Sequence, residues 1–330
     1  MSDTIKEAQF YEKFKDGRIK CFLCPHGCEI SHNMVGKCRV RKNSSKGLIT
    51  LNYGKITAHN MDPIEKKPLY HFYPGKNIFS IGSFGCNLKC SFCQNYSIAH
   101  GNPECTEAMP EKVAEISSRQ IDNIGVAYTY NEPSVWYEFV LDTAKLVREK
   151  GKKNVVVSNG YIEREPLLRL IPHIDAMNID LKSFSKKFYN DICKGEQSPV
   201  METILTARKD CHIEITTLLI EGLNTEREEI AQLAKWVSSI DRDIPLHLSR
   251  YYPAYEMDLP ATSVKTIIEL YNESKQYLNY VYIGNIYGFD NNTYCPNCKT
   301  LIVSRDFKVE IQSLVSGLCN NCGEKIRIVF

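Results

Sequence analysis

Eleven of the fourteen cysteines in this chain fall into three short groups, and thiolates grouped in this way are typical metal ligands. Disulfide frameworks with such counts belong to secreted chains below about 100 residues, which this chain exceeds. We therefore expect metal chemistry at three places, and small buried side chains at the isolated Cys105, Cys193 and Cys211. The three groups are Cys21, Cys24, Cys28 and Cys38; Cys86, Cys90 and Cys93; and Cys295, Cys298, Cys319 and Cys322.

The central group has three cysteines separated by three and two residues, within the stretch 85–95, here called the cysteine loop. This spacing lets an irregular loop wrap three thiolates around one 4Fe-4S cubane, and Gly82 and Gly85 permit a tight turn before it. Three ligands leave one of four irons open, as in catalytic metal sites that keep a free position. A zinc knuckle or three packed cysteines is the alternative interpretation. The loop reads Gly85-Cys86-Asn87-Leu88-Lys89-Cys90-Ser91-Phe92-Cys93-Gln94-Asn95.

The last group consists of two CxxC pairs separated by 20 residues, Cys295 with Cys298 and Cys319 with Cys322. Four thiolates complete a tetrahedron, so this pattern predicts a closed site for zinc, or for iron in rubredoxin fashion. We favour zinc, because a ribbon this small needs a metal for its stability.

The first group is less conventional in spacing, and His26 and His32 lie among its cysteines. A second metal held by Cys21, Cys24, Cys28 and Cys38 is the prediction, and a reduced, packed set of thiols is the alternative.

The segment between these groups must position the central loop, and it alternates short apolar runs with longer amphipathic stretches. This is the βα pattern of an α/β fold, which predicts a partial or full TIM-type barrel with its chemistry at the carboxyl ends of the strands. We expect helices over 110–124, 134–150 and 225–239. The expected strands are 78–81, 125–130, 154–158, 176–181, 212–219, 245–251 and 281–283.

Three units follow from these patterns. Residues 1–76 form a small cysteine-rich module, residues 77–288 the barrel, and residues 289–330 a metal ribbon, here called the terminal ribbon. The net charge of +2, from 41 basic and 39 acidic residues, excludes the one-signed surface of a non-specific nucleic-acid binder. No apolar run is long enough for a membrane span, and Met1-Ser2-Asp3-Thr4 does not resemble a signal peptide, so we expect a cytoplasmic protein.

The cysteine loop resembles the signature of the radical S-adenosylmethionine (SAM) superfamily, including the aromatic Phe92 before the last cysteine. The resemblance extends through the central region and implies a 4Fe-4S cluster with SAM at its open iron. It also implies reductive cleavage of SAM to methionine and a 5'-deoxyadenosyl radical, which abstracts hydrogen from a substrate. An external one-electron donor of the flavodoxin or ferredoxin type is the implied partner.

Three further stretches resemble elements of the pyruvate formate-lyase activating enzyme branch. Thr129-Tyr130-Asn131-Glu132-Pro133 stands where that branch holds the amino group of SAM, Ser158-Asn159-Gly160 resembles its Thr-Asn-Gly, and Asp180-Leu181-Lys182 matches its Asp-x-Lys. Val157 replaces the acid that precedes the second element. A stretch over 247–253 lies where relatives approach the adenosine, and alternation alone does not tell which residues face the pocket. The resemblance implies cofactor contacts from Asn131, Glu132, Asn159, Asp180 and Lys182.

Nearly the whole chain is similar to the radical SAM component of the AmmeMemoRadiSam system. The similarity rests on Cys24-Pro25-His26-Gly27-Cys28, on the run 36–41 (GKCRVR), on Pro74-Gly75 and on the terminal ribbon. Memo-type and AMMECR-type proteins become candidate partners by this association. The N-terminal and C-terminal metal modules could close a pocket over the barrel, which favours a small molecule or a peptide as substrate. The alternatives are an activase that acts on a protein loop of a glycyl-radical enzyme, and a non-catalytic metal-binding scaffold.

Overall fold

The computed structural model describes residues 6–330, so Met1–Thr4 and the first five residues of the N-terminal module lie outside the described part. Its centre is an eight-stranded sheet in which all neighbours are parallel except β8 and β9. All seven strands expected from the sequence are present. In spatial order the strands are β16 (Val281–Gly284), β15 (Leu246–Arg250), β14 (His212–Leu219), β13 (Ala176–Asp180), β12 (Lys153–Ser158), β11 (Asn123–Tyr128), β9 (Asn77–Gly82) and β8 (Ala58–Pro63).

The sheet curves but does not close, because its two outer strands, β8 and β16, do not pair with each other within residues 6–330. A partial barrel is therefore confirmed, and a full barrel is not formed. The outer edge of β16 is covered by the side chain of Asn291. Its Oδ1 accepts a hydrogen bond from Ile283 N at 2.9 Å, and its Nδ2 donates to Ile283 O at 2.8 Å.

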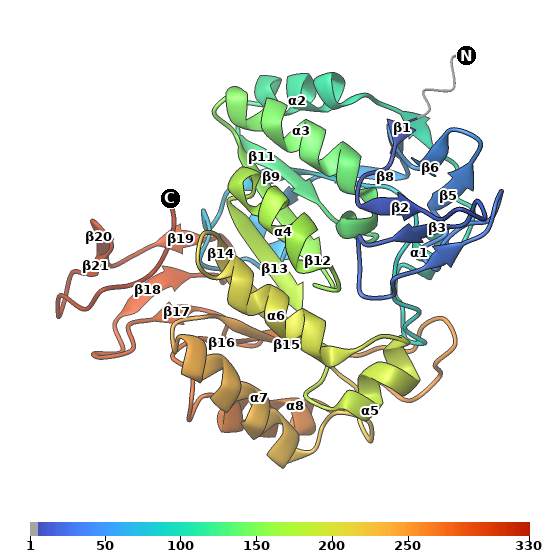
Figure 1. The fold of residues 1–330 in the computed structure, drawn as a ribbon. Helices are drawn as coiled ribbons and strands as arrows, with labels where there is room; N and C mark the ends of the chain where they lie inside the picture. Colours follow the sequence, from blue (N-terminus) through green and yellow to red (C-terminus); the bar gives the residue numbers. More distant parts are fainter. Residues whose placement is uncertain (1–5) are drawn as a thin grey trace.

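Helices cover the outer face of the curved sheet (Figure 1). The first expected helix ends at Arg119, before β11 begins, and the second starts at Tyr137, because a 3₁₀ turn occupies Pro133–Trp136. No helix in the described part of the chain is both long and apolar enough to cross a lipid bilayer. The helices are α1 (Tyr96–Ala99), α2 (Pro110–Arg119), α3 (Tyr137–Glu149), α4 (Arg164–Leu170), α5 (Lys186–Phe188), α6 (Gln197–Ala207), α7 (Arg227–Ile240) and α8 (Val264–Ser274).

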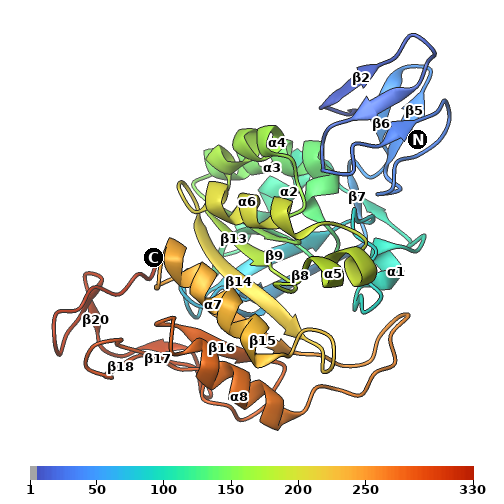
Figure 2. The ribbon, with the colours of Figure 1, turned by 60° about the horizontal axis from the view of Figure 1, so that its bottom comes forward.

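The N-terminal strands form two small antiparallel sheets that pack beside α3 (Figures 1 and 2). The buried guanidinium of Arg41 pairs with the buried carboxylate of Glu138 on α3 at 2.5 Å, and Lys6 pairs with Asp142 at 2.6 Å. The first sheet consists of β1 (Lys6–Glu7), β6 (Gly47–Thr50) and β5 (Arg41–Ser44), and the second of β2 (Tyr11–Lys13), β3 (Ile19–Cys21) and β4 (Glu29–Ile30). A separate pair is formed by β7 (Lys55–Ile56) and β10 (Thr106–Glu107).

The terminal ribbon lies at the opposite end of the molecule from these strands (Figure 2). It docks on the segment that precedes β9 through Arg305, whose Nη2 donates to Tyr70 O at 2.6 Å, and through Val329, whose N donates to His71 O at 2.9 Å. Its strands are β17 (Thr293–Tyr294), β18 (Leu301–Ser304), β19 (Glu310–Ile311), β20 (Leu314–Val315) and β21 (Leu318–Cys319).

A buried polar network lies at the end of the central sheet on which the terminal ribbon docks. The carboxylate of Glu214 on β14 accepts hydrogen bonds from the backbone N–H groups of Tyr70 and His71, at 3.0 and 2.7 Å. It also contacts the ring nitrogens of His212 and His247 at 3.1 and 2.6 Å. Because every oxygen of this buried carboxylate has partners, the network holds the segment before β9 against the sheet.

We expect acid to destabilise the protein through His71. Burial, with smaller contributions from Arg305 and His212, lowers the pKa of His71 to about 3, although Glu214 opposes this shift. In the unfolded chain the pKa of histidine is about 6.5, so the unfolded state binds more protons between these two values, and stability falls as the pH falls below about 6.5. At pH 5 the loss is about 2 kcal/mol.

Urea unfolding at pH 7 and pH 5 measures this loss. The variant His71→Asn should lose about 2 kcal/mol less between the two pH values than the parent, whereas His59→Asn, at an exposed position, should behave as the parent. An unchanged pH dependence in His71→Asn would contradict the assignment.

Candidate functional site

One cavity of about 310 Å³ lies where the parallel strands end, and it brings together every residue that the sequence analysis assigned to the central site. Its volume is within the range of small-molecule sites. The residues come from the loops after β9, β11, β12 and β13, as expected for chemistry at the carboxyl ends of parallel strands. They are Cys86, Cys90, Cys93, Asn131, Glu132, Asn159, Asp180 and Lys182.

Backbone contacts hold the cysteine loop in place. Lys89 N donates to Cys193 O at 2.9 Å, and Ser91 N donates to Ile192 O at 3.2 Å. The thiol of Cys193, one of the isolated cysteines, is fully buried and hydrogen-bonds Cys90. Gly85 adopts a φ of +93°, which strains any residue with a side chain, so the turn into the loop requires glycine here.

Glu132 is buried at the wall of the cavity and joins two of the strand-end loops. Its Oε1 accepts hydrogen bonds from Ser134 N at 2.9 Å and Ser158 Oγ at 2.7 Å, and its Oε2 accepts one from Asn159 N at 2.8 Å. Burial raises the pKa of this carboxyl group, although its hydrogen bonds lower it. A carboxylate can accept about four hydrogen bonds. Three of them come from the protein here, so Oε2 can accept one more from a ligand.

The side-chain amides of Asn131 and Asn159 hold the cysteine loop in place through hydrogen bonds. Asn131 Oδ1 accepts from Ser83 N at 2.9 Å, and its Nδ2 donates to Gly85 O at 3.1 Å. Asn159 Nδ2 donates to Asn87 Oδ1 at 2.9 Å and lies 3.6 Å from Cys86 Sγ. Both amides therefore orient the loop that carries the thiols.

Lys182 provides a positive charge in the cavity. Its Nζ donates to Asp180 Oδ2 at 2.9 Å and lies 5.8 Å from the centroid of the Phe92 ring. Burial lowers the pKa of Lys182, but Asp180 and the neighbouring Cys90 raise it by more, so the net shift is well above the usual value. The ammonium group therefore stays charged and can attract an anionic ligand group.

The cavity also contains polar residues that the sequence analysis did not assign. Asn285 Nδ2, after β16, donates to Ser249 Oγ on β15 at 3.0 Å, and both residues line the cavity with Thr216. Of the stretch over 247–253, Ser249 faces the cavity, whereas His247 contacts Glu214 at the other end of the sheet. Their position at strand ends was the available signal, but it did not distinguish these side chains from their neighbours.

The loop that follows β15, residues 251–262, here called the roof loop, lies across the cysteine loop. Glu256 N donates to Ser91 O at 3.0 Å, and Gln94 Nε2 donates to Tyr252 O at 3.1 Å. The Tyr255 ring stacks on Tyr96 with centroids 5.0 Å apart. The roof loop thus packs against the cysteine loop.

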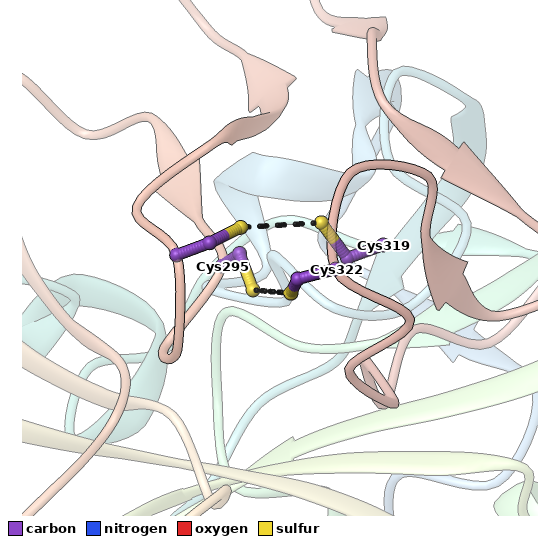
Figure 3. A group of neighbouring side chains, drawn as sticks. Cys295, Cys319 and Cys322 are labelled. Carbon is purple, nitrogen blue, oxygen red and sulfur yellow. Dashed lines mark hydrogen bonds between the residues drawn. The ribbon is translucent and has the colours of Figure 1, made fainter.

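The four cysteines of the terminal ribbon converge on one point (Figure 3). Their sulfur atoms all lie within 4.8 Å of one another, with Cys295 to Cys322 and Cys298 to Cys319 both at 3.6 Å. Hydrogen bonds lower the pKa of Cys298, and the one with the Thr300 hydroxyl contributes most. The lowered pKa favours the thiolate form. This group can hold a metal ion in a closed, four-sulfur site.

The four N-terminal cysteines also line one small cavity, here called the N-terminal sulfur pocket. His26 lies on the same cavity, whereas His32 is exposed. The members of the pocket are Cys21, Cys24, Cys28 and Cys38.

Comparison with known proteins places these features in a family. The model of the radical SAM superfamily matches residues 80–234. An uncharacterized protein of Methanocaldococcus jannaschii is 40% identical over 98% of this chain and 100% of its own length. The pyruvate formate-lyase-activating enzyme of Clostridium pasteurianum is 25% identical over 51% of this chain and 72% of its own length. The structure of Streptococcus suis SuiB bound to the precursor peptide SuiA shares the fold, with a TM-score of 0.51 and 15% identity, over 68% of this chain and 52% of that one.

Proposed function

The chain belongs to the radical SAM superfamily, and from this premise we propose that it uses a 4Fe-4S cluster and SAM to abstract hydrogen from a small molecule or a peptide. The observation that carries this proposal is that Cys86, Cys90 and Cys93 line one cavity together with five polar residues. When bound, the cluster and SAM supply one-electron cleavage to methionine and a 5'-deoxyadenosyl radical.

The donor set of the cavity fits these groups. Three thiols from one loop would ligate three irons, and the fourth iron would face the charged side chains. Glu132 Oε2, with its remaining acceptor position, would bind the amino group of SAM, and Lys182 would attract its carboxylate. Asn131 and Asn159 would act through the loop that they brace, because their amide groups already contact it.

Anaerobic turnover tests the proposal. Reconstituted protein with dithionite and SAM should form 5'-deoxyadenosine and methionine in equal amounts, measured by liquid chromatography and mass spectrometry. Protein that carries a complete cluster at Cys86, Cys90 and Cys93 yet forms no 5'-deoxyadenosine would exclude the proposed reaction.

Lys182 gives a sharper test of the cofactor orientation. Replacing Lys182 with methionine removes a charge-assisted hydrogen bond of about 1.5–3 kcal/mol, so the Kd for SAM should rise roughly 10- to 100-fold. Lys89→Met is the matched control, because Lys89 lies on the cysteine loop but has a largely exposed side chain. Equal SAM affinity in Lys182→Met and the parent, measured by equilibrium binding, would show that Lys182 does not contact the cofactor.

A small molecule or a peptide is the substrate class that we favour, because the cavity has a volume of about 310 Å³. The roof loop packs against the cysteine loop through Ser91 and Gln94. The 25% identity to a pyruvate formate-lyase-activating enzyme favours the second candidate function, an activase of a glycyl-radical enzyme. Transfer of deuterium from a labelled glycine in a candidate protein into 5'-deoxyadenosine would favour the activase.

The finer assignment that we propose is to the AmmeMemoRadiSam system, with Memo-type and AMMECR-type proteins as partners and a flavodoxin or ferredoxin as electron donor. It is supported by the Cys-Pro-His-Gly-Cys run at 24–28 and by the CxxC pairs of the terminal ribbon. We also propose zinc in the ribbon, a second metal in the N-terminal sulfur pocket, and units at 1–76, 77–288 and 289–330. A cytoplasmic location is part of the proposal, because reducing conditions keep such thiols available for metals.

A further inference from the structure

The N-terminal sulfur pocket is assembled from separate turns around β3, β4 and β5. Cys21 ends β3, and Cys38 precedes β5. Both side chains are less than a tenth exposed, and the apolar side chains of Leu23, Ile30 and Val135 complete the wall. Four thiols therefore share one cavity with largely apolar walls.

The spacing of these sulfur atoms differs from that in the terminal ribbon. All four ribbon sulfurs lie within 4.8 Å of one another, whereas among the described residues no three sulfurs of the N-terminal sulfur pocket meet that limit. One zinc ion with bonds of about 2.3 Å to four thiolates requires sulfurs about 3.8 Å apart. A cubane binds each thiolate at a different iron, so its four ligands stand farther apart. The wider spacing of the sulfur atoms in the N-terminal sulfur pocket therefore fits a 4Fe-4S cluster better than a single zinc ion.

A buried cation also faces this pocket. Arg41 lines it, is 1% exposed, and places Nη1 at 4.0 Å from Cys21 Sγ. One Arg41 nitrogen, Nη2, is paired with Glu138, while its buried Nε has no hydrogen-bond partner. An unsatisfied buried N–H is costly, and the sulfides and thiolates of a cluster in this pocket would be hydrogen-bond acceptors close to Arg41.

The pocket directly adjoins the cysteine loop of the central site. A Cβ at Gly85, the residue before Cys86, would stand only 2.9 Å from Cys38 O. His26 Nε2 lies 2.6 Å from Asn87 O, and the Asn87 side chain is bonded to Asn159, which contacts Cys86. The two sulfur sites are therefore linked through the shared loop.

From these observations we propose that Cys21, Cys24, Cys28 and Cys38 bind a second 4Fe-4S cluster beside the catalytic one. Four cysteine ligands leave no open iron, so this cluster does not bind SAM, and its chemistry is that of a one-electron carrier. The charge of Arg41 offsets part of its negative charge. The proposal extends the proposed function and does not depend on SAM cleavage.

Analysis of the unaltered, anaerobically reconstituted protein gives the first test. Two 4Fe-4S clusters contain about eight irons and about eight acid-labile sulfides per chain, whereas one contains half as many. After reduction with dithionite, electron paramagnetic resonance should show two signals, of which SAM changes only one. Zinc in place of the second set of iron and sulfide, or no additional metal, would overturn the proposal.

Variants assign the second cluster to its ligands. With Cys86, Cys90 and Cys93 replaced by alanine, about four irons and four sulfides should remain, with a signal that SAM does not alter. Adding Cys24→Ala and Cys38→Ala should remove them. Adding Cys295→Ser and Cys322→Ser instead should leave the sulfide unchanged, because neither zinc nor a rubredoxin-type iron contains it. Loss of all sulfide from the first triple variant would contradict the proposal.

Discussion

Replacing Cys86, Cys90 and Cys93 with alanine is expected to reduce 5'-deoxyadenosine formation to the background of the protein-free reaction. These thiols are the only protein ligands that we propose for the catalytic cluster, and no neighbouring residue can take over three iron bonds at once. The variant should lose about four irons per chain and the part of the paramagnetic resonance spectrum that responds to SAM.

Cys105→Ala is the matched control, because this partly buried thiol lies outside the central cavity and donates a hydrogen bond to Pro103 O. Its iron content and turnover should equal those of the parent. Should the triple variant retain a cluster whose spectrum changes with SAM, the ligands have been assigned incorrectly.

Replacing Cys295 and Cys322 with serine is expected to release one metal ion and to open the terminal ribbon. Structural zinc contributes about 10–16 kcal/mol of apparent binding free energy in small sites, which exceeds what so few apolar side chains provide. The buried cluster of the ribbon contains only Ile302, Val303 and Ile326 besides its cysteines. Limited proteolysis should therefore cut beyond residue 290 at least about tenfold faster than in the parent.

A chelator added to the parent should reproduce this effect, and the double variant should keep its catalytic cluster. Elemental analysis distinguishes zinc from iron, and iron would give a rubredoxin-like absorption. A ribbon that resists protease and holds neither metal would contradict the prediction.

The seven parallel strands of the central sheet could be predicted from the sequence. The run Val155-Val156-Val157 lies in a strand that is buried at most positions, and such short β-branched runs between amphipathic stretches mark parallel strands. The resemblance to the activating-enzyme branch singled out Glu132, Asn159 and Lys182, and they line one cavity because the carboxyl ends of parallel strands lie at the same edge of the sheet.

Other features depend on contacts that local patterns do not encode. The edge strand β8 has the polar sequence AHNMDP and joins the sheet only by pairing with β9. The thiol of Cys193, at the end of a short π-helix, contacts Cys90 although it lies more than 100 residues downstream of that cysteine. The hydrogen bond between Ser249 and Asn285 likewise requires the packing of β15 against β16.

A sheet that stays open has two free edges, and each is a template to which a strand of another molecule could add. At the β16 edge the Asn291 side chain occupies both backbone groups of Ile283, as a neighbouring strand would. At the β8 edge the strand ends in Asp62 and Pro63, and proline offers no N–H to a newcomer. The incomplete barrel is thus protected from edge-to-edge aggregation by two different devices, without the closure that other barrels use.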